Sequence, residues 1–278
     1  MGKLRLLDLF SGIGGFSLGL ERSGGFETVA FCEIEEYPRR VLAKHWPKVP
    51  IYGDIRGLTA DTLRRDGIGV DAICGGFPCQ DISTAGLGAG LAGERSGLWS
   101  HYRRLIGELR PKIVIVENVS ALLSNGMGTV LGNLAALGYD CWWDSIPACA
   151  LGAPHERDRV WIVAHPHQDG ESPFAFHAKV ETSPDHGYTD ETRRKNVKGG
   201  PGSTRQARRA RREVPVANDA GRWASVWQDE SPLVRVVHGV SAEVDSVAAL
   251  GNSVVPQIPE MIGHAIQKVL AWHPNGDG

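Results

Sequence analysis

Short apolar runs alternate with segments of helical spacing over the first 165 residues. The apolar runs predict strands over 4–10, 28–32, 70–74, 113–116, 140–146 and 160–164. Helical patterns lie between them over 16–22, 37–45, 98–109 and 128–137. Strands that alternate with helices are typical of βαβ units, so we expect an α/β fold with a mostly parallel, twisted sheet and helices on both faces.

The periodic pattern ends after His165 and returns only near Leu233. Between Thr192 and Arg212 the chain carries nine Lys or Arg residues and no acid. A helical pattern over 259–270 then closes the sequence. We therefore expect one domain formed by 1–165 and 235–278, interrupted by an inserted region, 166–234, part of which is flexible.

The composition is that of an ordinary globular protein, with 42% hydrophobic and 22% charged residues in 278. Thirty basic and 32 acidic residues give a formal charge of −2, which excludes a uniformly basic coat but not a local basic patch. No apolar run approaches the roughly 18 residues of a membrane span, and the N-terminus lacks the pattern of a signal peptide. Five cysteines are an odd number for a disulfide scaffold. These features predict a reduced, cytoplasmic protein without a membrane partner.

A glycine-rich turn joins the first expected strand to the first expected helix, with the sequence DLFSGIGG over 8–15. Such a turn lets a ligand approach the backbone, and the following helix N-terminus favours an anionic group. Glu33 lies 21 residues after Gly12, at the expected end of the second strand, where a carboxylate can accept hydrogen bonds from ribose hydroxyls. The third glycine of the dinucleotide fingerprint is replaced by Ser17, so a tight turn that only packs helix on strand is the alternative.

The segment GGFPCQDIS over 75–83 places Cys79 just beyond the strand at 70–74. Open α/β sheets bind their ligands at this edge. A single cysteine is more often a small buried hydrophobe, but the polar, glycine-rich residues after Cys79 favour a position facing a cleft. The other four cysteines lie in or near apolar runs and are expected in the core: Cys32, Cys74, Cys141 and Cys149.

Two further segments carry candidate chemistry. Glu117 follows the strand at 113–116, where desolvation could raise its pKa and suit it to proton transfer; a solvated or capping carboxylate is the alternative. Arg157 and Arg159 alternate in the segment PHERDR over 154–159, so they share one face if that segment is extended. Two guanidiniums on one face suit a phosphate or a base oxygen, whereas the alternative is a surface ladder of ion pairs.

In their order and combination, these motifs resemble those of the DNA cytosine-5 methyltransferases, especially the short bacterial and phage members. DLFSGIGG resembles the cofactor loop of that family, GGFPCQDIS its nucleophile motif, ENV its carboxylate motif and PHERDR its arginine motif. ALGNSVVP over 249–256 is similar to its final cofactor motif. The resemblance covers about 1–165 and 235–278. It implies a Rossmann-like, S-adenosylmethionine-dependent methyltransferase fold in which 166–234 is the target recognition region.

The resemblance also implies a reaction. Cys79 would attack carbon 6 of a cytosine flipped out of double-stranded DNA, and Glu117 would hold the ring at N3 and the exocyclic amine. Arg157 and Arg159 would contact the base oxygen or adjoining phosphates. Carbon 5 would take a methyl group from S-adenosylmethionine, with no metal, and the chain would act as a monomer, with a restriction endonuclease as a candidate partner.

Ten positions match the family's cofactor contacts. The pattern implies that Phe10 and Ile34 pack on the adenine, that Glu33 takes the ribose and that Asp54 meets the adenine amine. The remaining positions implied in the cofactor site are Gly12, Gly14, Ile55, Pro78, Asn252 and Ser253.

Three other interpretations stay open at the level of sequence. The tRNA-directed branch of the family shares the same chemistry. A nucleotide-dependent oxidoreductase would use the glycine-rich turn but would leave FPCQ, ENV and GNSVVP unexplained. A catalytically inactive DNA-binding relative would not need both Cys79 and Glu117.

Overall fold

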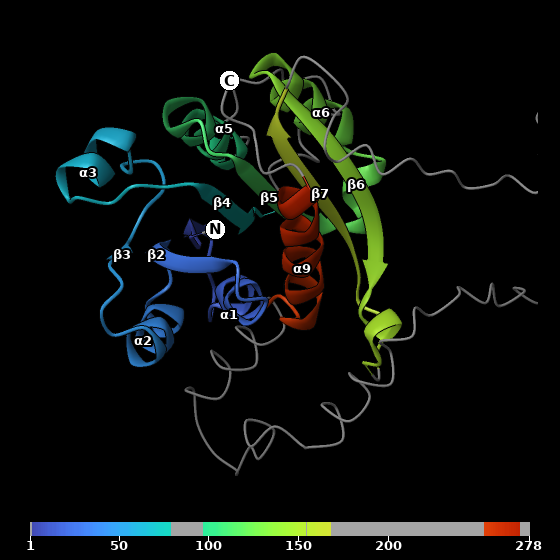
Figure 1. Ribbon diagram of the computed structural model, residues 1–278, viewed down its shortest axis with the longest axis horizontal. Helices are drawn as coiled ribbons and strands as arrows, with labels where there is room; N and C mark the ends of the chain where they lie inside the picture. Colours follow the sequence, from blue (N-terminus) through green and yellow to red (C-terminus); the bar gives the residue numbers. More distant parts are fainter. Residues whose placement is uncertain (1, 79–96, 154, 168–252, 273–278) are drawn as a thin grey trace, which may run out of the picture.

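The computed structural model describes residues 2–78, 97–153, 155–167 and 253–272 (Figure 1). Cys79, Asn252 and nearly all of the expected insert lie outside these residues. The described residues contain a seven-stranded sheet with the strand order β3-β2-β1-β4-β5-β7-β6. The strands are β1 Leu4–Leu9, β2 Phe26–Cys32, β3 Ile51–Tyr52, β4 Ala72–Gly76, β5 Ile113–Val119, β6 Tyr139–Pro147 and β7 Asp158–Pro166.

Helices cover both faces of the sheet, as Figure 1 shows. One core lies between the sheet and the helices α3, α5 and α6, and the other lies between the sheet and α1 and α9. The helices are α1 Gly15–Arg22, α2 Glu36–His45, α3 Ala60–Arg65, α5 Gly97–Leu109, α6 Met127–Ala136 and α9 Gln257–Trp272, with 3-10 turns η2 Ser120–Leu123 and η3 Ala148–Leu151. The predicted α/β fold with helices on both faces is confirmed.

The sheet is parallel from β3 to β5, but β7 is antiparallel to both β5 and β6. A parallel pair requires a crossover connection, whereas β6 leads to β7 through the short turn η3 and a few further residues. The strand β3 and the helix α3 were not predicted, because two and six residues are too few for a periodic pattern to stand out.

The last described helix, α9, packs beside the first helix, α1 (Figure 1). The Gln267 amide donates a hydrogen bond of 2.8 Å to the Ser23 carbonyl at the end of α1. Three isoleucines of α9 join the core that also holds Phe16 and Leu20 of α1: Ile258, Ile262 and Ile266. The C-terminal segment therefore returns to the α/β domain, whereas the wider division into domain and insert stays a prediction.

The expectation for the cysteines is only partly met. Cys32 and Cys74 are buried, but Cys141 is only half-buried and Cys149 is exposed. The core assignment of Cys149 is wrong because this residue lies in η3, beyond the end of β6. Among the described residues, no helix is long and apolar enough to span a membrane.

Candidate active site

Four strands end at one edge of the sheet and bring the candidate residues together. Leu9 at the end of β1 pairs with Cys32 of β2 on one side and with Gly75 of β4 on the other. Gly76 pairs in turn with Glu117 of β5. The order of the strands changes direction between β1 and β4: β2 and β3 follow on one side and β5 on the other. Open α/β sheets bind their ligands at such a switch point.

The turn after β1 requires a backbone conformation that favours glycine. Gly12 has a φ of +52° and Gly14, immediately before α1, has a φ of +88°. The Ser11 hydroxyl closes the turn by donating a 2.6 Å hydrogen bond to the Asp8 carbonyl. Phe10 has a φ of +53°, a costly conformation for a residue with a Cβ, and such conformations cluster at functional sites.

Glu33 connects this turn to the end of β2. Its Oε2 accepts a 2.7 Å hydrogen bond from the Gly12 amide, and its Oε1 accepts one of 2.8 Å from the Glu35 amide. The carboxylate is buried. Each carboxylate oxygen has two lone pairs, so Glu33 retains acceptor capacity for ligand hydroxyls while it holds the turn.

A pocket of about 430 Å³ opens beside the turn, within the size range of small-molecule sites. Six residues implied by the resemblance line it: Phe10, Glu33, Ile34, Asp54, Ile55 and Pro78. Gly12, Gly14 and Ser253 are not among its lining residues, and Asn252 lies outside the described part of the chain. The side chain of Ile34 is 61% exposed, so the pocket offers an apolar surface that a planar ring could cover.

Sequence reasoning missed several lining residues, among them Arg56, Leu98 and His101. Leu98 and His101 are three apart near the start of α5, so they lie on one face of that helix. This spacing, just after the glycine-rich segment, was the signal in the sequence that could have identified the two residues as part of the site. Burial and the nearby Arg104 lower the pKa of His101, which favours its neutral form.

Glu117 lies in β5, the neighbour of β4, and forms an ion pair with Arg159 of β7. The Arg159 Nε lies 3.1 Å from the Glu117 Oε1, and the Glu117 side chain is only 13% exposed. Burial raises the pKa of the Glu117 carboxyl above its ordinary value, although Arg159 and Arg157 act in the opposite direction. The carboxyl therefore holds a proton at higher pH than an exposed glutamate would.

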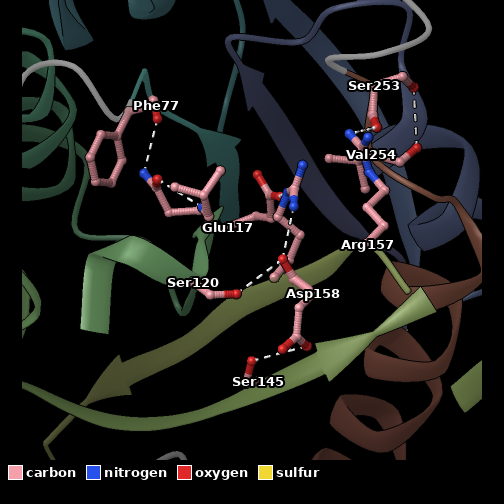
Figure 2. Close-up of polar contacts among 11 residues, drawn as sticks. Phe77, Glu117, Ser120, Ser145, Arg157, Asp158, Ser253 and Val254 are labelled. Atoms are coloured by element: carbon pink, nitrogen blue, oxygen red, sulfur yellow. Dashed lines mark hydrogen bonds and ion pairs between the residues drawn. The ribbon is translucent and has the colours of Figure 1, made fainter. Parts of the chain in front are cut away.

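Asn118 fixes the backbone that leads to Cys79. Its buried amide donates a 2.9 Å hydrogen bond to the Phe77 carbonyl, and its Oδ1 accepts one of 2.9 Å from the Val119 amide (Figure 2). The two strand ends are therefore locked together, and Pro78 lies on the pocket wall. Sequence reasoning recognised the ENV motif but gave a role only to its glutamate.

The two arginines have different partners. Arg159 lies in β7 and pairs with Glu117, whereas the Arg157 Nη2 donates a 2.6 Å hydrogen bond to the Ser253 carbonyl (Figure 2). Arg157 precedes β7 and has a φ of +34°, so the segment is not extended there. The alternation that predicted a shared face therefore does not hold at Arg157.

Asp8 lies beneath the glycine turn and is fully buried. The Ser17 hydroxyl donates a 2.7 Å hydrogen bond to its Oδ2, but burial dominates and raises the pKa of Asp8 to about 7. Within the described residues, no three His, Cys, Asp or Glu side chains are placed to hold a metal ion.

This buried carboxyl makes stability depend on pH. Below the ordinary pKa of an aspartate, Asp8 is neutral in both states; as pH rises towards about 7, only the unfolded chain ionises freely, so the folded state loses stability. We expect Asp8→Asn to remove this loss, on the order of 2–4 kcal/mol between pH 5 and 8. Urea unfolding at both pH values measures it. Asp61→Asn, at an exposed acid of α3, is the control, and an equal pH dependence in both variants would contradict this account.

Comparisons with known proteins identify the family of this chain. A family model described as C-5 cytosine-specific DNA methylase matches residues 4–218. The Type II methyltransferase M2.BsuMI of Bacillus subtilis (strain 168) is 36% identical over 174 residues, which are 60% of this chain and 43% of the relative. The chain spans half or less of the length of the curated relatives that it matches.

Two solved structures share the fold. One is described as a DNA modification methyltransferase encoded within prophage Cp of E. coli; it is 28% identical, with a TM-score of 0.50 over 59% of this chain and 47% of that chain. The Dnmt2 methyltransferase of S. pombe is 20% identical, with a TM-score of 0.51 over 61% of this chain and 52% of that chain, and it supports the fold alone. Because the family model matches well over half of its residues, the chain belongs to the C-5 cytosine-specific DNA methylase family.

Proposed function

We propose that this chain is a DNA cytosine-5 methyltransferase that transfers a methyl group from S-adenosylmethionine to carbon 5 of a flipped-out cytosine. The observation that carries the proposal is the arrangement at the ends of β4 and β5. Asn118 of β5 holds the Phe77 carbonyl, Pro78 lines the pocket, and Glu117 of β5 forms the ion pair with Arg159. Cys79 is the next residue of the sequence after Pro78. A nucleophile, a proton donor and a cofactor pocket would then share one edge of the sheet.

The pocket fits the chemical groups of S-adenosylmethionine. Phe10 and Ile34 offer apolar surface for the adenine, and the Glu33 carboxylate retains lone pairs for the ribose hydroxyls. Asp54 can accept a hydrogen bond from the adenine amine. The start of α1 does not line the pocket, but a helix N-terminus just after the turn would suit the carboxylate of the methionine part. When bound, the cofactor supplies an electrophilic methyl group.

The residues of the chain would activate the base. The Cys79 thiolate forms a bond to carbon 6, and the electron pair of the C5–C6 double bond becomes available at carbon 5. Glu117 donates its proton at N3 and so neutralises the charge that develops on the ring, while Arg159 orients the carboxyl. Methyl transfer leaves S-adenosylhomocysteine. Loss of the carbon 5 proton to a base and departure of the Cys79 thiolate then restore the C5–C6 double bond, and N3 returns its proton to the Glu117 carboxylate.

Double-stranded DNA is the proposed partner. A base inside the duplex is inaccessible to Cys79, so the target must leave the stack. The basic run from Thr192 to Arg212 suits phosphate contacts, but it lies outside the described residues, as does the rest of the target recognition region. We further propose a monomeric, cytoplasmic enzyme, and the Type II names of the relatives favour a restriction–modification context with an endonuclease partner.

Mass spectrometry of nucleosides tests this function. The chain is incubated with methyl-labelled S-adenosylmethionine and either duplex DNA or tRNA, and the nucleic acid is then digested. We expect labelled 5-methylcytosine in DNA. Label in tRNA alone would favour the RNA-directed branch, DNA binding without label would indicate an inactive relative, and binding of NAD in place of S-adenosylmethionine would support the oxidoreductase.

Replacing Glu33 should weaken cofactor binding. Glu33→Ala removes the acceptor for the ribose and also releases the Gly12 amide, so we expect a loss on the order of 1.5–3 kcal/mol in calorimetry with S-adenosylmethionine. Glu36→Ala is the matched control, because Glu36 is an exposed acid that pairs with Arg40 on the surface. Equal affinity of the Glu33 variant and the wild type would refute this placement of the cofactor.

A further inference from the structure

The segment 253–256, which precedes α9, lies directly against α1. A Cβ atom on Gly15 would stand 2.4 Å from the Val254 carbonyl oxygen, and one on Gly19 would stand 2.1 Å from that of Pro256. Both contacts are shorter than any side chain tolerates, so only glycine allows this approach. The segment therefore supports the helix that begins immediately after the glycine turn.

Arg157 also holds this segment. Its Nη2 donates the 2.6 Å hydrogen bond to the Ser253 carbonyl, across 96 positions of the sequence (Figure 2). Arg157 is half-buried, and its φ of +34° is a conformation that persists only where surrounding contacts maintain it. Two residues further on, Arg159 pairs with Glu117. The short stretch 157–159 thus contacts both the Glu117 carboxylate and the segment 253–256, which supports α1 just after the glycine turn.

We propose that Arg157 is a positioning residue that fixes the segment 253–256 against α1, and that it thereby sets the affinity of the glycine turn for the cofactor. This rests on the proposed function, and it replaces the base or phosphate contact expected for Arg157 from the sequence. The turn and the first amides of α1 must be held in place before a ligand arrives, because a mobile site has to be ordered at the cost of affinity. A charged hydrogen bond in a partly buried position is suited to this task.

Substitution of Arg157 tests the proposal. We expect Arg157→Ala to raise the Kd for S-adenosylmethionine about tenfold or more, the size expected for one charged hydrogen bond. Arg157→Lys should recover part of the affinity, because an ammonium group can still donate to the Ser253 carbonyl. Arg159→Ala should leave the cofactor Kd unchanged and abolish methylation, since Arg159 contacts Glu117 instead.

A second variant disturbs the same segment through its contact with α1. Gly19→Ala lies in α1, outside the glycine turn, and its Cβ would displace Pro256. We expect it to weaken cofactor binding as well, and the double variant Arg157→Ala/Gly19→Ala to lose less than the sum of the two, because both changes release one element. Gly132→Ala in α6 is the matched control, since a Cβ there meets nothing within 4 Å. Thermal unfolding of each variant confirms that it is folded.

Hydrogen exchange tests the contact without any cofactor. The Ile258 and Glu260 amides donate to the carbonyls of Val255 and Pro256, so release of the segment should speed their exchange in Arg157→Ala. Unchanged exchange, a wild-type Kd in Arg157→Ala, or full additivity with Gly19→Ala would each overturn the proposal. If the wild type failed to bind S-adenosylmethionine, the proposed function would fall and with it the link to affinity, whereas faster exchange would still establish the tie to the segment.

Discussion

DNA in which 5-fluorocytosine replaces cytosine should become covalently attached to the wild-type chain but not to Cys79→Ser. Fluorine at carbon 5 cannot leave as a proton does, so the adduct between Cys79 and carbon 6 cannot resolve after methyl transfer. Full replacement of cytosine makes the test independent of the recognition sequence. The attached species should survive denaturing electrophoresis. Serine should not form it, because its hydroxyl stays protonated at a pH where a thiol is partly ionised.

The described residues support this assignment up to Pro78, the residue before Cys79. Phe77 is buried, its ring centroid lies 5.2 Å from that of Trp99, and its carbonyl accepts the Asn118 hydrogen bond. Pro78 lies on the pocket wall. The pairing of Gly76 with Glu117 brings the two strand ends together. Cys79 itself lies outside the described residues, so the trapping experiment is the direct measurement of its role.

Two cysteine variants serve as controls for the trap. Cys74→Ser should still form the adduct, because Cys74 is fully buried in β4 and burial raises the pKa of its thiol well above the ordinary value. Cys149→Ser should also form it, because this exposed thiol lies in η3, beyond β6. Loss of the adduct in either control, or methylation by Cys79→Ser at the wild-type rate, would contradict the proposed mechanism.

The sequence pattern predicted the parallel strands β1, β2, β4 and β5 because each is a mainly apolar run between helical segments, but it missed the two-residue strand β3. The antiparallel pair was harder to assign, since the direction of a strand depends on its partner. The strand β6 lies at the edge of the sheet, and Trp142 and Trp143 on it remain 41% and 45% exposed. The apolar pattern therefore located β6, but it did not indicate that β6 is an edge strand with two exposed tryptophans.

The candidate site likewise contains features that the sequence predicts and features that it does not. Residues at strand ends, such as Glu33 and Glu117, could be predicted because the edge of a parallel sheet gathers the carboxyl ends of its strands. Contacts between residues that lie far apart in the sequence could not be predicted. The hydrogen bonds from Asn118 to Phe77 and from Arg157 to Ser253 span 41 and 96 positions, and no local pattern encodes such distances. The double role of Glu33, on the turn and towards the pocket, is likewise visible only in three dimensions.

Glu117→Gln should methylate DNA about 10²–10⁴-fold more slowly than the wild type, the usual contribution of a general acid. The substitution preserves the size of the side chain where space is limited: a Cβ on the neighbouring Gly76 would stand 2.6 Å from the Glu117 Oε2. It removes the acidic proton and the ion pair with Arg159. DNA binding should persist, because the side chain is largely buried and offers little surface to the duplex.

The dependence of the rate on pH separates proton donation from a purely structural role. Burial raises the pKa of Glu117, so its acid form persists to higher pH than that of an exposed glutamate and is lost as pH rises through the raised pKa. The Cys79 thiolate has the opposite dependence and becomes more abundant as pH rises. The wild type should therefore show a rate that rises and then falls with pH, whereas Glu117→Gln should retain only the rise. Glu156→Gln, at an exposed acid of the PHERDR segment, should keep both limbs. A falling limb that survives in Glu117→Gln would show that another group donates the proton.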